Sequence, residues 1–182
     1  MPRDMKQTIA EAMVSMLEEK PLDKITVKDL VEGCGICRQT FYYHFQDLMD
    51  VIEWTITQTM QRTLKESLAA EDAQEALRAF VASAVKRRDL IQKLLSSQRR
   101  EQVERIMVQA FRAYLGEMAS RRLPDLVLSP VDQAMLLDFY SFGIVGLLLE
   151  HSRDRQVDVD VLASRMYRLL SGQTAGSLFQ KV

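Results

Sequence analysis

The side chains with the densest hydrogen-bonding capacity lie together in one short segment near the N-terminus. A guanidinium can donate two hydrogen bonds to guanine, and a carboxamide can bond adenine in the same bidentate way, so Arg38 and Gln39 could read base edges. Hydroxyl and imidazole groups can bond phosphate oxygens, which sets register without reading sequence. The groups of this second kind are Thr40, Tyr42, Tyr43 and His44. The set suits the groove of a DNA duplex better than a protein core.

Two short helices and a glycine-containing turn must position these side chains. Thr26 can cap the first helix, and Asp29, three residues later, completes a capping-box pattern. Gly35 lies in the turn, where glycine can adopt a positive φ angle because it has no Cβ. The second helix is expected over residues 37–45. Lys28, early in the first helix, can reach the DNA backbone of the flanking strand.

The rest of the chain also predicts helices. Its 182 residues are rich in helix formers, include only seven glycines and four prolines, and lack alternating runs of β-branched residues. The net charge of −1 supplies no general attraction to nucleic acid or to an anionic membrane. We expect an all-α fold with further helices over residues 3–19, 48–68, 76–86, 87–97, 101–121, 130–151 and 159–170.

Residues 9–54 resemble the DNA-binding domain of the tetracycline-repressor (TetR) family. The matching residues are Ile25-Thr26-Val27, Gly35-Ile36 and Thr40-Phe41-Tyr42-Tyr43-His44-Phe45. The resemblance implies an N-terminal three-helix helix-turn-helix domain, residues 1–47. It also implies a C-terminal helical bundle, residues 48–182, that binds an effector and dimerises. By family position, the DNA-contacting residues are Lys28, Arg38, Gln39, Thr40, Tyr42, Tyr43 and His44.

The N-terminal region departs from the family pattern at two positions and from most nucleic-acid modules in its charge. Leu48 stands where family members often have a lysine that contacts phosphate. Residues 1–54 contain six Lys and Arg residues against ten Asp and Glu residues, a net charge of −4. Most nucleic-acid modules are basic, so we expect weak non-specific binding and a modest dependence on salt. Cys37 opens the second helix, and a thiol caps a helix more weakly than the serine that is usual in the family.

Cys34 and Cys37 form a C-x-x-C pattern, which occurs in redox sites and in half of a zinc site. The C-x-x-C pattern of a redox site occurs near a βαβ unit, which this helical sequence does not predict. A zinc site needs two more ligands, and the only candidates are His44 and His151. The favoured interpretation is that Cys34 packs in the core and Cys37 takes the cap position, with no metal and no cofactor. The alternative is a thiol switch, in which oxidation distorts the turn and releases DNA.

Residues 134–149 form the most apolar stretch of the chain. The stretch is short for a membrane span and contains Asp138, so we expect no membrane partner. A helix this apolar is expected to be buried on both sides. Helices 134–151 and 159–170 are therefore predicted to form a four-helix interface in a homodimer. An effector pocket is expected among the middle helices, lined by Phe80, Met107, Phe111, Tyr114, Phe139 and Tyr140.

These features predict a regulator that binds double-stranded operator DNA. The resemblance to the TetR family implies that it is a homodimer, and that it acts as a repressor released by a small-molecule or protein effector. The alternative keeps the fold but places control in a protein partner, or in oxidation of Cys34 and Cys37. A helical enzyme is not favoured, because no nucleophile–base pair or metal cluster is visible in the sequence. The N-terminus lacks the apolar region of a secretory signal, so a cytoplasmic protein is expected.

Overall fold

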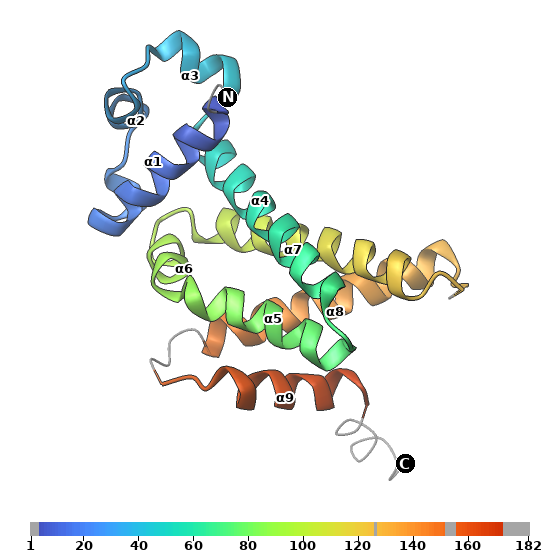
Figure 1. Ribbon diagram of the computed structural model, residues 1–182. Helices are drawn as coiled ribbons and strands as arrows, with labels where there is room; N and C mark the ends of the chain where they lie inside the picture. The colour runs from blue at the N-terminus through green and yellow to red at the C-terminus, as the bar shows by residue number, and fades with distance from the viewer. Residues whose placement is uncertain (1–3, 126, 152–155, 173–182) are drawn as a thin grey trace. The chain divides into compact units, whose positions relative to one another are not determined.

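The computed structural model describes residues 4–125, 127–151 and 156–172, and every regular element within them is a helix. The predicted all-α class is therefore confirmed (Figure 1). The largest difference from the expected bounds is at the fifth helix, which begins at Ala73 because Asp72 accepts a hydrogen bond from the Glu75 amide and caps it. The elements are α1 (Met5–Glu19), η1 (Leu22–Lys24, a 3₁₀ turn), α2 (Val27–Cys34), α3 (Arg38–His44), α4 (Leu48–Ala69), α5 (Ala73–Lys86), α6 (Arg88–Leu95), α7 (Arg100–Arg122), α8 (Pro130–His151) and α9 (Val159–Leu170).

The chain divides into two compact units. The first contains the residues up to Thr59 together with Asp89–Ala110, and the second contains Met60–Arg88 and the residues from Phe111 onward. The long helices α4 and α7 each contribute one part to each unit. Most of α6 and the first half of α7 thus belong to the same unit as the helix-turn-helix. A functional boundary between residues 47 and 48 stays a prediction.

Buried apolar side chains from α1 to α4 form one core in the first unit, and α6 and α7 add to it. Asp4 caps α1 by accepting from the Lys6 amide, and Asp47 Oδ1 accepts from the amides of Met49 and Asp50 at the start of α4. The Gln98 amide donates to the Asp23 carboxylate, which ties the turn before α7 to η1. The central core residues include Ile9, Met13, Leu17, Leu30, Phe41, Phe45, Val51 and Val103.

In the second unit, α5 and α9 lie side by side (Figure 1). Arg78 on α5 forms an ion pair with Asp160 on α9. Helix α8 contacts α7 through an ion pair between Asp138 on α8 and Arg112 on α7, with 2.6 Å between Asp138 Oδ1 and Arg112 Nε. Arg122, in the last turn of α7, donates to the carbonyls of Ser67 (2.8 Å) and Ala70 (2.6 Å) at the end of α4. These contacts satisfy carbonyls that have no partner within α4.

Helix α8 exposes much of its apolar surface. Among the described residues it is the one helix long and apolar enough to cross a membrane by length and composition, and 17% of its apolar window is buried. Ser141, Ile144 and Val145 form its inward face. Its exposed apolar side chains are Val131, Met135, Leu136, Phe139, Phe142 and Leu147. The expectation that this helix is buried on both sides is not met within a single copy of the chain.

Candidate nucleic-acid interface

Helix α3 presents a polar face to solvent on an apolar base. Arg38 and Gln39, in its first turn, are exposed, while Thr40 and His44 are half-buried. Tyr42 and Tyr43 are both exposed, the latter to 84%. The rings of Tyr42 and Phe41 also form a T-shaped pair, with 5.3 Å between their centroids, so Tyr42 is both exposed and in contact with the buried side of α3.

The apolar side of α3 fixes the direction of this polar face. Phe41 is fully buried and Phe45 nearly so, and their ring centroids lie 6.2 Å apart. Trp54 on α4 meets Phe45 edge-on at 6.1 Å, and Lys6 Nζ lies 5.3 Å from the centre of the Phe45 ring. These contacts pack the apolar side of α3 into the core, so its polar side faces outward.

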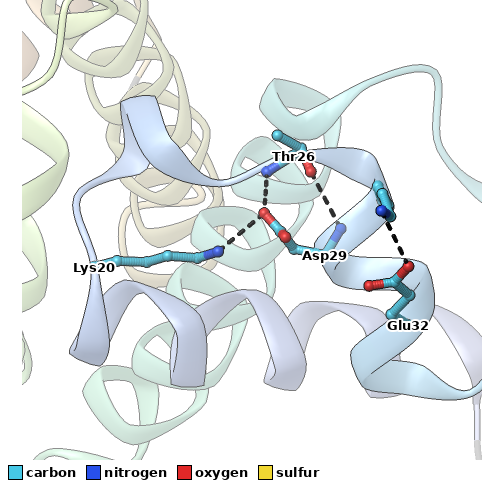
Figure 2. Close-up of polar contacts among 5 residues, drawn as sticks. Lys20, Thr26, Asp29 and Glu32 are labelled. Atoms are coloured by element: carbon cyan, nitrogen blue, oxygen red, sulfur yellow. Dashed lines mark hydrogen bonds and ion pairs between the residues drawn. The ribbon is translucent and has the colours of Figure 1, made fainter.

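Helix α2 begins at the predicted capping box (Figure 2). Thr26 Oγ1 accepts from the Asp29 amide at 3.2 Å, and Asp29 Oδ2 accepts from the Thr26 amide at 2.8 Å. Lys20 Nζ also donates to Asp29 Oδ2 at 2.9 Å. The Lys20 bond, helped by the two Thr26 bonds, lowers the pKa of the Asp29 carboxyl to about 2. Asp29 is therefore ionised at neutral pH and joins α1 to the start of α2.

The turn between α2 and α3 has the conformation that its glycine predicts. Gly35 has φ +64° and ψ +34°, in the left-handed region, and its amide donates to the carbonyl of Glu32. The Ile36 amide donates to the carbonyl of Val31 at 3.0 Å, which closes the end of α2. An L side chain at position 35 would be strained by this backbone, although the space around it is open.

Half of the ten acidic residues in this region have a structural use. Five carboxylates accept backbone N–H groups: Asp4, Asp23, Asp29, Asp47 and Asp50. Such acceptors near helix N-termini satisfy amides that the helix itself leaves free. Glu32 is different, because its recorded side-chain partner is Lys28, with 3.7 Å between Nζ and Oε1. This pair was missed at the sequence level, although the i, i+4 spacing of Lys28 and Glu32 is visible there.

The two cysteines have different environments. Cys34 is half-buried, and burial raises the pKa of its thiol. Cys37 is exposed at the N-cap of α3, where its side chain makes no capping hydrogen bond. Its Sγ lies 3.3 Å from the Thr40 hydroxyl, and this hydrogen bond is the main reason that the pKa of the Cys37 thiol is lowered. Within the described ranges, no group of three or more His, Cys, Asp or Glu residues could hold a metal ion.

The residues expected to line an effector pocket do not all come together. Phe80, Phe111 and Tyr114 form one buried cluster, with ring centroids 4.5 to 5.4 Å apart. Tyr114 donates from its hydroxyl to Ser67 Oγ at 2.8 Å. Phe139 is 73% exposed and contacts the half-buried Tyr140 edge-on. Met107 packs against the core of the first unit. The pocket itself stays a prediction.

A polar helix presented by a helix-turn-helix, in a chain that continues into an all-helical unit, defines a two-part DNA-binding transcriptional regulator. A family model described as "Transcriptional regulator C-terminal region" matches residues 71–172, which is more than half of the chain. The chain belongs to the TetR family of transcriptional regulators.

Curated relatives match over part of their length. The HTH-type transcriptional regulator EthR of Mycobacterium tuberculosis (strain ATCC 25618 / H37Rv) is 32% identical over 84 residues, which cover 43% of this chain and 39% of EthR. EthR of Mycobacterium bovis matches with the same identity and coverage. The chain therefore spans well under half the length of these relatives.

Solved structures share the fold over nearly the whole chain. Lin0861 from Listeria innocua has a TM-score of 0.73 at 19% identity and covers 96% of each chain. The dihydroxyacetone kinase operon activator DhaS has a TM-score of 0.63 at 18% identity, covering 92% of this chain and 94% of DhaS. The TetR family repressor AlkX from Dietzia sp. strain DQ12-45-1b has a TM-score of 0.59 at 16% identity, covering 94% of this chain and 95% of AlkX. At these identities the likeness concerns the fold alone.

Proposed function

We propose that the protein is a homodimeric, sequence-specific repressor that binds operator DNA through α3 and is released by an effector. Arg38 and Gln39 read base edges, and the phosphate contacts are made by Lys28, Thr40, Tyr42, Tyr43 and His44. The observation that carries this proposal is the exposed polar face of α3 on its buried aromatic base. A major groove admits such a helix with its N-terminal residues toward the bases.

The proposed dimer forms through α8 and α9. Phe139 and Phe142 on α8 are exposed, and Val161 and Leu169 give α9 an exposed apolar component as well. Soluble monomers rarely expose large apolar patches, so the exposed apolar side chains of α8 favour a partner. An added Cβ at Gly143 or Gly146 would meet nothing within 4 Å, so a partner helix could approach α8 closely there. Two copies related by a two-fold axis would bury this surface and present two α3 helices to the DNA.

Control by a small molecule requires space in the second unit. The predicted lining residues Phe80, Phe111 and Tyr114 are at most 6% exposed and pack against one another. A small effector at this position would have to displace these rings. Their packing favours a second candidate, in which a protein partner controls the same DNA-binding dimer. A scan for small molecules that shift thermal unfolding and release DNA separates the two candidates.

The experiment that tests the proposed function is in vitro selection of bound sequences from a random duplex library with the purified protein. The proposal expects one sequence with two-fold symmetry, because a symmetric dimer reads the same half-site twice. Recovery of no preferred sequence would contradict it. The solved structures of the same fold include a named repressor and a named activator, so a transcription assay on the selected site tests the sign of control.

A further inference from the structure

We propose that Glu32 limits phosphate-driven DNA binding by competing for Lys28, an inference that rests on the proposed phosphate contact of Lys28. The two residues are one helical turn apart on α2, with 3.7 Å between Lys28 Nζ and Glu32 Oε1. Both side chains are about two-thirds exposed, at 66% and 65%. The contact lies on the surface of α2, and Figure 2 labels Glu32 at the end remote from the capping box.

Helix stability does not account for this pair. Lys28 is the second residue of α2, near the positive end of the helix dipole, and Glu32 lies in the last turn, near the negative end. Each charge therefore opposes the dipole. The order also runs from lysine to glutamate, which is the less favourable direction for an i, i+4 pair. The proposed phosphate contact accounts for a lysine near the N-terminus of α2. It does not account for a glutamate near the C-terminus of the same helix.

The aspartates of the region that accept backbone amides are used in ways that Glu32 is not. Asp29, on the same helix, is committed to the capping box and to Lys20. The segment Val27–His44 contains two basic residues, Lys28 and Arg38, and two acidic ones, Asp29 and Glu32. The motif that should approach a polyanion is thus electrically neutral. Because Asp29 is fixed by the fold, Glu32 is the carboxylate whose removal changes this balance without disturbing a cap.

At the DNA surface, Lys28 cannot bind both the Glu32 carboxylate and a phosphate oxygen at the same time. A phosphate oxygen that accepts from Lys28 replaces the Glu32 carboxylate, which then lies near a second negative charge. Both effects weaken binding to every sequence alike, since phosphates carry no sequence information. Removing the charge should therefore raise affinity for any duplex by roughly three- to ten-fold at moderate salt. The slope of log affinity against log salt should steepen by up to about 0.9, the value for one additional phosphate neutralised.

The test measures fluorescence anisotropy of a labelled mixed-sequence duplex over a salt series with Glu32→Gln, Glu11→Gln and the wild type. Glu11→Gln removes the same charge from an exposed site on α1, where Glu11 accepts from Gln7. The proposal expects tighter binding and a steeper slope for Glu32→Gln alone. In a Lys28→Met background the gain from Glu32→Gln should shrink. Equal behaviour of the two glutamine variants, or a full gain without Lys28, would overturn it.

Failure of this proposal is distinguishable from failure of the proposed DNA interface. If Arg38→Ala leaves operator binding intact, the interface assigned to α3 is wrong. If Arg38→Ala weakens operator binding while Glu32→Gln behaves as Glu11→Gln does, the proposed role of Glu32 is wrong and the proposed DNA interface stands. Thermal unfolding of Glu32→Gln should start no lower than that of the wild type, because the replaced charge opposes the helix dipole.

Discussion

Lys20 Nζ lies 2.9 Å from Asp29 Oδ2, and this contact connects the end of α1 to the cap of α2 (Figure 2). The same carboxylate accepts the Thr26 amide at 2.8 Å. One side chain thus fixes both the start of α2 and its attachment to the rest of the first unit. The proposed DNA-contacting residue Lys28 directly precedes Asp29, so it lies in the helical turn that this ionised carboxylate caps.

Asp29→Asn should destabilise the protein in a pH-dependent way. Hydrogen bonds lower the pKa of the folded carboxyl to about 2, below its ordinary value of 3.8. A lowered folded pKa means that the ionised form stabilises the fold at a pH above the unfolded pKa, and that this stability is lost as the pH falls toward 2. Urea unfolding should therefore separate the variant from the wild type at pH 7 and bring them together near pH 2. Glu53 is exposed, so Glu53→Gln serves as the control. If the unfolding free energies of Asp29→Asn and the wild type differ by the same amount at every pH, the lowered pKa of Asp29 does not stabilise the fold.

Tyr114→Phe should cost about 1–2 kcal/mol of unfolding free energy, because it leaves a buried hydroxyl without its donor. Tyr114 donates to Ser67 Oγ at 2.8 Å, and the Ser67 hydroxyl donates onward to the Ala76 carbonyl at 3.2 Å. Ser67 is fully buried. Chemical unfolding measures the cost, with Tyr140→Phe on α8 as the matched control. Equal stabilities of the two variants would show that the Tyr114–Ser67 bond contributes nothing.

Phe142→Glu should convert the proposed dimer to a monomer without unfolding it. The side chain is exposed on α8 in a single copy, so the charge costs nothing there, whereas burial of an unpaired charge in an interface costs about 3–5 kcal/mol. Self-association should weaken by roughly 100-fold or more. Sedimentation velocity measures the effect. Leu123→Glu replaces an exposed apolar residue outside α8 and α9 and should leave the dimer unchanged. A dimer that persists in Phe142→Glu contradicts this interface.

Cys37→Ser should raise the thermal midpoint slightly and leave operator affinity unchanged. Cys37 holds the N-cap position of α3 without a capping hydrogen bond, and a serine oxygen accepts there more strongly than sulfur. The variant also tests thiol control. Peroxide treatment of the wild type should leave its operator affinity equal to that of Cys37→Ser. Release of DNA by the oxidised wild type, but not by the variant, would favour the thiol switch.

The sequence predicted the local structure well because the deciding signals are local. Thr26 and Asp29 form the expected capping box, Gly35 adopts the expected left-handed conformation, and Ser129 Oγ accepts from the Asp132 amide at the start of α8. The aromatic residues Phe41 and Phe45 lie four positions apart, the spacing of one helix face, and both are buried. In each case residues three to five positions apart determine the outcome.

Long-range relationships were harder to predict. Met107 lies on the same helix as Phe111 and Tyr114, yet it packs on the core of the first unit while they pack in the second. A hydrophobic period indicates which face of a helix is buried, but it does not say which neighbour covers that face at each turn. The exposed face of α8 is a further case, because a partner's surface is not encoded within the helix. The i, i+4 spacing of Lys28 and Glu32 is visible in the sequence, but spacing alone does not show whether two exposed side chains meet.

In the proposed interface, α3 reads DNA sequence through Arg38. The most direct measurement compares the affinity of the wild type, Arg38→Ala and Lys28→Ala for the selected operator and for a mixed-sequence duplex at one salt concentration. Arg38→Ala should weaken operator binding by about 1–3 kcal/mol and mixed-sequence binding by much less, whereas Lys28→Ala should weaken both alike. If Arg38→Ala weakens both duplexes equally, or neither, α3 does not read sequence through this residue.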